Sequence, residues 1–184
     1  MTTGKDGKFG PIKLKVDGNY LVMSKKANFL TNREEFSMNG REIPQSLLKK
    51  PITDTTFYTS LNLEPIFVGK TFRVDNIYYD LDKWDIRTDA ALELDKLVQV
   101  MNEYPNMVIF AKSHTDSRGK DKYNLDLSDR RAKSTVQYLI SKGISKDRIS
   151  GQGFGETEPK VICEECTEEE HAQNRRSEFL IVKK

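Results

Sequence analysis

The sequence predicts an α/β fold for residues 71–184, an α+β sandwich in which helices cover one face of a mixed sheet. The first indication is the apolar run Met107-Val108-Ile109-Phe110, which is short enough for a buried strand. The second is the segment after Asn124, where apolar side chains recur near helical spacing until Gly143 ends the pattern. With the flanking elements, the expected order is strand, helix, strand, helix, strand, short helix, strand, which is typical of a two-layer domain.

Each element of this domain has a local signal in the sequence. Thr88 is expected to cap a first helix that stops before Pro105, and Asn124 to be the N-cap of a second helix. The buried face of the first helix is expected to hold Ala91, Leu94, Leu97, Val98 and Met101. The strands are expected at 72–79, at 107–112, from Ile149 onward and at 177–183, with a short helix inside 164–170.

Residues 1–70 are expected to form a β-rich partial domain or linker. Ile12 to Val16 alternates apolar and polar residues, and Asp17-Gly18 before Tyr20–Met23 predicts a hairpin. A further alternating run, Phe57 to Leu63, predicts another strand, and residues 41–54 a long connection. The segment resembles the second half of a carboxypeptidase-regulatory-like β-sandwich at Asp6-Gly7-Lys8-Phe9 and Gly18-Asn19-Tyr20. A half sandwich has an unpaired edge, so we expect it to lean on the second domain or on another chain.

The composition excludes several classes of protein. Of the 184 residues, 36% are hydrophobic and 32% charged, as in a soluble globular protein, and the net charge of +2 gives no broad basic surface for nucleic acid. No apolar run reaches the roughly 20 residues of a transmembrane helix. The first residues, Met1-Thr2-Thr3-Gly4, lack the apolar region of a signal peptide.

The polar loop between the strand at 107–112 and the second helix carries the candidate site. Asp116 lies in this loop, and Arg131 follows about two turns into the expected helix. A strand-loop-helix unit folds its helix back on the sheet, so the two side chains are expected to converge. Arg binds a carboxylate through two parallel hydrogen bonds and Asp binds an ammonium group, a combination that suits the free end of an amino acid. The alternative is a plain salt bridge that positions the loop.

Several spaced motifs resemble the OmpA-like (OmpA C-terminal or Pal-like) peptidoglycan-binding family over about residues 70 to 184. They are His114-Thr115-Asp116-Ser117-Arg118-Gly119, Tyr123-Asn124, Leu127-Ser128 with Arg131-Ala132, Ile77 to Lys83, Gly153-Phe154-Gly155-Glu156 and Asn174-Arg175-Arg176. The resemblance implies that Asp116 and Arg131 hold meso-diaminopimelate of the peptidoglycan stem peptide. It also implies a periplasmic location and a chain cut from a longer protein. Ser113 stands where the family usually has Gly.

Other residues are expected to line the same groove, and each has a structural alternative. The Thr115 backbone and the backbone amides of Leu81 and Asp82 are candidate donors to the ligand's carboxylates. Asn124 contacts the ligand or only caps the helix, and Leu127 lines the groove or belongs to the core. No cofactor is expected.

Cys163 and Cys166 are the two cysteines of the chain, in Cys-Glu-Glu-Cys. We expect a short-loop disulfide in an oxidising compartment. The alternatives are a redox pair and half of a zinc site completed by His171 and nearby glutamates, and neither has the further motif that such sites usually show.

A peptidoglycan-modifying hydrolase is the alternative function. Ser113, His114 and Asp116 are the residue types of a hydrolytic triad, but neighbours on one short loop cannot easily line up as nucleophile, base and orienter. No phosphate loop, nucleophile elbow or metalloprotease motif is present. We therefore expect a non-enzymatic binder.

The resemblance also suggests a wider role. We expect a non-catalytic anchor that ties an outer-membrane assembly to the cell wall, with peptidoglycan and other outer-membrane or secretion-complex proteins as partners. The β unit ahead of the second domain and the Cys-Glu-Glu-Cys segment resemble PorE-type lipoproteins of the type IX secretion system. Pal-like lipoproteins and flagellar stators are the alternatives.

Overall fold

A computed structural model describes residues 2–15, 18–41, 46, 56–73 and 84–184 of the chain. It divides into two compact units, Met1–Pro65 and Ile66–Lys184. The predicted residues of the first strand beyond Arg73, and Leu81 and Asp82, lie outside the described residues. No helix in the described ranges has the length and apolar character needed to cross a membrane.

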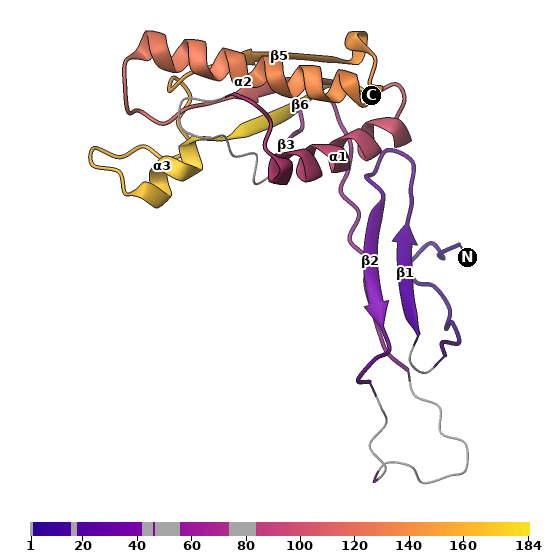
Figure 1. Ribbon diagram of the computed structural model, residues 1–184. Coiled ribbons are helices and arrows are strands. Elements are labelled where there is room, and N and C mark those ends of the chain that lie inside the picture. The colour runs from indigo at the N-terminus through magenta and orange to yellow at the C-terminus, as the bar shows by residue number, and fades with distance from the viewer. Residues whose placement is uncertain (1, 16–17, 42–45, 47–55, 74–83) are drawn as a thin grey trace. The chain divides into compact units, whose positions relative to one another are not determined.

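The second unit is built on a four-stranded mixed sheet (Figure 1). Its strands are β3 (Thr71–Arg73), β6 (Ser177–Lys183), β4 (Val108–Ser113) and β5 (Ile149–Gly153), in this spatial order. β4 pairs with β5 in parallel, whereas β6 is antiparallel to both β3 and β4. The predicted fold class, a mixed sheet combined with helices, is therefore confirmed.

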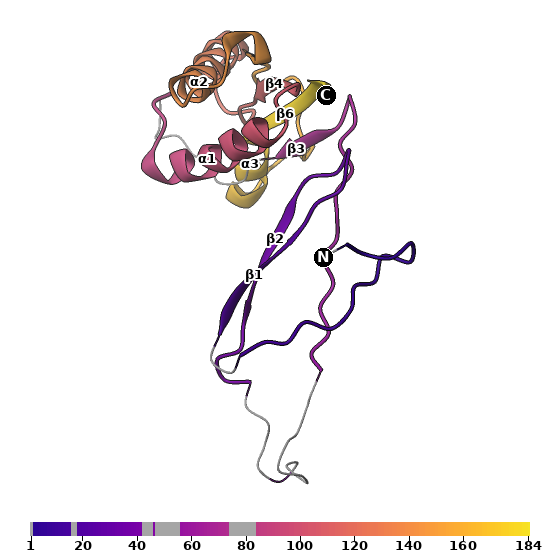
Figure 2. The same ribbon diagram turned by 90° about the vertical axis from the view of Figure 1, so that its right-hand side faces the viewer.

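Two long helices, α1 (Thr88–Glu103) and α2 (Asp121–Ser141), lie on the same face of this sheet (Figure 2). The Tyr138 hydroxyl on α2 joins them, because it donates to the Asp95 carboxylate at 2.9 Å and lies 3.3 Å from the Ala91 carbonyl oxygen. The short 3-10 helix η2 (Lys146–Arg148) precedes β5, and α3 (Glu168–Asn174) precedes β6.

The core lies between the sheet and the two long helices. Alternate residues of β4 and β6 are buried, as expected for strands with one face on a core. The fully buried apolar side chains include Leu94, Met101, Ile109, Leu139, Phe179 and Ile181. Burial of each such side chain contributes about 1.5–3 kcal/mol, so this layer sets the position of the loops at the ends of the strands.

The predicted N-cap was wrong by four residues for α2 and by one residue for α1. α2 begins at Asp121 with Lys120 as its N-cap, so Asn124 lies inside the helix instead of capping it. Similarly, Thr88 is the first residue of α1 and Arg87 is the N-cap, with Ala90 rather than Ala91 buried. Neither N-cap side chain accepts a hydrogen bond from the backbone amides of its helix, so the usual Ser, Thr or Asn signal was misleading.

Among its described residues, the first unit contains one antiparallel strand pair, β1 (Asn19–Ser24) with β2 (Asn32–Ser37). The predicted hairpin around Asp17-Gly18 was wrong, because residues 12–15 form no strand and β1 pairs further along the chain. The sequence of β2 is Asn-Arg-Glu-Glu-Phe-Ser, so its single large apolar residue gave no alternating pattern to detect.

The predicted strand from Phe57 to Leu63 is also absent. Residues at the end of this segment and just after it instead make single contacts with the start of β2 and the residues before it. The Asn32 side chain donates to the Asn62 carbonyl at 3.0 Å, the Leu30 amide donates to Glu64 at 2.8 Å, and Phe29 forms a single bridge with Pro65. The expectation that this unit leans on other protein surface stays a prediction.

Candidate ligand-binding site

The site begins where β4 ends, at the buried residues Ser113, His114, Thr115 and Asp116. Backbone hydrogen bonds hold this turn in place. The His114 amide donates to the Arg176 carbonyl and the Thr115 amide to the Gly155 carbonyl, both at 2.9 Å. The turn is therefore fixed between the start of β6 and the loop after β5.

Asp116 is 6% exposed and is surrounded by arginine donors. Its Oδ2 accepts from Arg118 Nη2 at 2.7 Å and from Arg175 Nη1 at 2.6 Å, while its Oδ1 accepts from the Arg118 amide at 3.1 Å. Burial alone would raise the pKa of this carboxyl. The hydrogen bonds from Arg118 and Arg175 outweigh that effect and lower the pKa of Asp116 to about 2. Asp116 is thus ionised at neutral pH.

The same two arginines also bind Glu168, the first residue of α3. Arg118 Nη1 donates to Glu168 Oε2 at 2.8 Å, and Arg175 Nη2 donates to Glu168 Oε1 at 2.6 Å. The four charges of Asp116, Arg118, Arg175 and Glu168 sum to zero. We call this group of four residues the arginine clamp.

The first half of α2 packs against the Asp116 turn through Asn124, which is 2% exposed. Its side-chain amide donates to the Asp116 carbonyl at 3.3 Å and the Arg118 carbonyl at 3.1 Å, and it also contacts the Glu156 carboxylate. One turn on, Ser128 Oγ accepts from the Gly155 amide at 2.8 Å. These contacts fix the helix relative to the turn more specifically than an N-cap would.

Arg131 lies on the same buried face of α2 as Asn124, Leu127 and Ser128. It is 7% exposed and Leu127 is 9% exposed. The spacing of seven residues between Asn124 and Arg131 places them about two turns apart on one side of the helix. Both residues of the predicted pair, Asp116 and Arg131, are thus buried on elements that Asn124 joins directly.

Thr115 differs from its expected use. Its amide, expected as a donor to a ligand, is already donated to Gly155. Its hydroxyl is buried and has no hydrogen-bond partner among the described residues. The Thr115 hydroxyl therefore replaces the amide as the candidate ligand group of this residue.

His114 is 1% exposed and stacks on Phe154, with ring centroids 5.6 Å apart. Burial, followed by the nearby Arg176 guanidinium, lowers the pKa of His114 to about 4. Neither of its ring nitrogens, nor Ser113 Oγ, has a hydrogen-bond partner within the described part of the chain. There is consequently no Ser113–His114 hydrogen bond of the kind that a hydrolytic relay requires.

Cys163 and Cys166 are joined by a disulfide just before Thr167, the N-cap of α3. Thr167 and Glu170 form a capping box, each side chain bonding the other's backbone amide. Glu170 also lies beside the two sulfurs, but a disulfide offers no thiolate to a metal. The disulfide and the capping box together fix the start of α3 and therefore the position of its first residue, Glu168.

Three residues of the arginine clamp were missed as site residues. Arg118 and Arg175 were named only as members of family motifs, and Glu168 was not named. The motifs were the one signal for the two arginines, but only the fold brings Arg175 to Asp116 across 59 positions of sequence.

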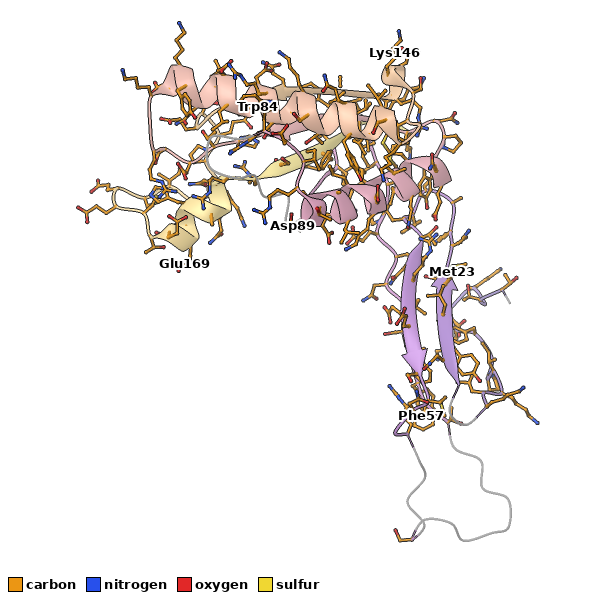
Figure 3. All side chains as sticks on the ribbon, in the orientation of Figure 1. Met23, Phe57, Trp84, Asp89, Lys146 and Glu169 are labelled. Carbon is orange, nitrogen blue, oxygen red and sulfur yellow. A yellow bond between two sulfur atoms is a disulfide. The ribbon has the colours of Figure 1, made fainter. Side chains whose placement is uncertain are left out.

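Arg130, the neighbour of Arg131, lies on the exposed side of α2. It forms an ion pair with Asp126 one turn earlier, at 2.8 Å. Its guanidinium also lies over the Trp84 ring at 4.7 Å, beside α2 in Figure 3. Trp84 therefore contacts Arg130 on the exposed side of α2.

Comparison with known proteins identifies the family of the second unit. The family model described as "OmpA family" matches residues 78–175. The chain is 38% identical over 103 residues to a peptidoglycan-associated lipoprotein of Rhizobium meliloti, covering 56% of this chain and 57% of that protein. The chain thus spans less than two thirds of that relative's length.

Solved structures share the fold. The peptidoglycan-associated lipoprotein from Burkholderia pseudomallei has a TM-score of 0.51 at 25% identity, covering 59% of this chain and 88% of that one. The periplasmic domain of Helicobacter pylori MotB has a TM-score of 0.54 at 22% identity, covering 65% and 86%. This chain belongs to the OmpA family.

Proposed function

We propose that the second unit binds peptidoglycan non-covalently through the meso-diaminopimelate of its stem peptide, and that it does so without catalysis. The observation that carries the proposal is the burial of Asp116 and Arg131 on two elements joined by Asn124. An ionised carboxylate and a guanidinium held in this way suit the ammonium and carboxylate groups of one amino-acid end. The similarity to peptidoglycan-associated lipoproteins supports the choice of ligand.

Asn124, Leu127 and Thr115 complete the proposed wall of the groove. Asn124 holds the Asp116 turn, Leu127 offers an apolar surface, and the Thr115 hydroxyl offers a donor and an acceptor. Leu81 and Asp82 remain part of the proposal on the strength of the family resemblance alone.

The test is co-sedimentation of the purified chain with isolated cell walls. Asp116→Ala and Arg131→Ala should each lower retention on walls that contain diaminopimelate, because loss of one partner of a buried charge pair costs about 2–5 kcal/mol of binding. Arg131→Gln, which keeps most of the side-chain volume, is the second variant if Arg131→Ala does not fold. Walls with lysine in place of diaminopimelate lack the distal carboxylate and should retain less protein.

Arg130→Ala is the matched control. It removes the same type of side chain from the adjacent position, but Arg130 is exposed and paired with Asp126. Folded variants at Asp116 and Arg131 that bind like Arg130→Ala would refute the site. Release of soluble muropeptides from the walls would refute the non-enzymatic assignment.

We propose a periplasmic location and an anchoring role that links an outer-membrane assembly to the cell wall. The family membership and the Cys163–Cys166 disulfide, which suits an oxidising compartment, support this. As the assembly, we propose the type IX secretion system, on sequence resemblance to its lipoproteins. Co-purification after crosslinking in the source cells, compared with the Asp116→Ala variant, tests which envelope proteins accompany the chain.

A further inference from the structure

The proposed function uses Asp116 and Arg131 and leaves the exposed side of the arginine clamp unexplained. Glu168 places one carboxylate oxygen on each of two guanidinium groups, at 2.8 Å from Arg118 and 2.6 Å from Arg175. Two separate arginines that share one carboxylate form a receptor of the kind used for carboxylate ligands. In this structure the receptor is filled by the protein's own side chain.

The burial of the clamp differs sharply between its two acids. The side chain of Asp116 is 7% exposed, whereas that of Glu168 is 61% exposed. Arg118 is 54% exposed and Arg175 34% exposed. Exposed ion pairs contribute little, because water competes for both charges, whereas the buried acid is costly to leave unpaired. Glu168 is therefore the exchangeable partner of the clamp and Asp116 the fixed one.

We infer that Arg118 and Arg175 form a second carboxylate-binding subsite beside Asp116, and that Glu168 is an internal competitor displaced when a carboxylate of the ligand enters. This rests on the proposed function for the identity of the ligand. The subsite suits a ligand with several carboxylates, such as a stem peptide, because a second carboxylate can bind Arg118 and Arg175 while the first binds elsewhere in the groove. Exchange of one carboxylate for another keeps the net charge of the clamp at zero.

Glu168 can leave without disturbing the rest of the fold. It is the first residue of α3, and the capping box that starts this helix uses Thr167 and Glu170. The Asp116–Arg118 and Asp116–Arg175 hydrogen bonds do not involve Glu168. Substitution of Glu168 therefore empties the subsite but retains both arginines on Asp116.

Glu169→Gln is the matched control for Glu168→Gln. Both variants remove one negative charge from neighbouring positions of α3. Glu169 is exposed, as Figure 3 shows at the outer side of α3, and it makes no ion pair with the described residues. Any effect of net charge alone is thus common to the two variants.

The experiment measures binding of a soluble muropeptide containing meso-diaminopimelate by calorimetry, for the wild type, Glu168→Gln and Glu169→Gln. Glu168→Gln should bind about three- to tenfold more tightly than the wild type, the range expected when weak exposed ion pairs are removed as competitors. Glu169→Gln should match the wild type. Unchanged or weaker binding by Glu168→Gln, with the wild type binding normally, overturns the inference but leaves the proposed function intact.

A second measurement does not need peptidoglycan. Titration with sodium succinate, followed through the arginine Nε–H signals by NMR, should shift Arg118 and Arg175 at lower concentration in Glu168→Gln than in Glu169→Gln. If no variant responds to succinate, the subsite does not exist. If both arginines respond to succinate but no variant binds the muropeptide, the subsite stands and the proposed function fails.

Discussion

Arg175, the residue after α3, donates a hydrogen bond of 2.6 Å to Asp116, which lies 59 positions earlier in the chain. This contact joins the C-terminal part of the domain to the turn after β4. It also places a second guanidinium on an acid that Arg118 already binds. The charge state of the candidate site therefore depends on a residue that is remote in sequence.

Arg175→Gln should raise the pKa of Asp116 from its value of about 2, because one of its two guanidinium donors is lost. A carboxyl whose folded-state pKa lies below 3.8 stabilises the fold above pH 3.8, and this contribution is lost as the pH falls towards 2. The variant should consequently lose stability at higher pH than the wild type. Carboxyl carbon NMR titration measures the pKa directly. Arg176→Gln, whose arginine pairs with Glu178, should leave it unchanged.

His114 should make the stability of the domain depend on pH between about 6.5 and 4. Its folded-state pKa of about 4 lies below the ordinary 6.5, so the unfolded chain takes up the proton first and stability falls as the pH drops through this window. The loss should approach about 3 kcal/mol. Urea unfolding at pH 7.5 and pH 4 should show a larger loss of stability in the wild type than in His114→Gln. The variant of the second histidine, His171→Gln, should retain the dependence, and an equal slope in all three proteins would contradict the assignment.

Asn124→Ala should destabilise the domain by about 1–3 kcal/mol, because the Asp116 and Arg118 carbonyls lose a buried donor. It should also weaken binding of diaminopimelate-containing walls, since the Asp116 turn is no longer held to α2. Chemical denaturation and wall co-sedimentation measure the two effects. Asn102→Ala, at an exposed position of α1, is the control and should change stability by less than about 0.5 kcal/mol.

Much of the second unit could be predicted because its elements carry their own hydrophobic periodicity. β4, β6 and the buried face of α1 have regular apolar patterns, and the Asp116 motif lies directly after β4. The start of α2 could not be predicted in this way. Its first turn, from Asp121 to Asn124, is polar, and the buried side chain there is an asparagine that bonds to the Asp116 turn.

The parts that were missed depend on contacts between distant residues or on weak local signals. β2 pairs with β1 through its backbone, which its polar sequence does not reveal. The arginine clamp requires α3 to bring Glu168 and Arg175 to the Asp116 turn. An acidic run and a pair of arginines are common on solvated surfaces, so only the tertiary structure distinguishes these residues from their neighbours.

Gly153→Ala should be among the most destabilising single substitutions in the second unit. A Cβ at this position would lie 2.1 Å from the Asp129 amide nitrogen and 2.4 Å from the Ser128 carbonyl carbon, so β5 and α2 would have to move apart. Overpacking of this kind typically costs about 1–3 kcal/mol, and contact with rigid backbone should place this case at or above the upper end. The same movement would separate Ser128 from the Gly155 amide and displace the buried face that carries Arg131.

Thermal unfolding of Gly153→Ala should therefore show a large drop in midpoint, accompanied by loss of wall binding in whatever fraction stays folded. Gly10→Ala, where a Cβ meets nothing within 4 Å, is the control and should melt like the wild type. A Gly153→Ala variant as stable as Gly10→Ala would show that β5 and α2 do not pack as closely as the structure has them.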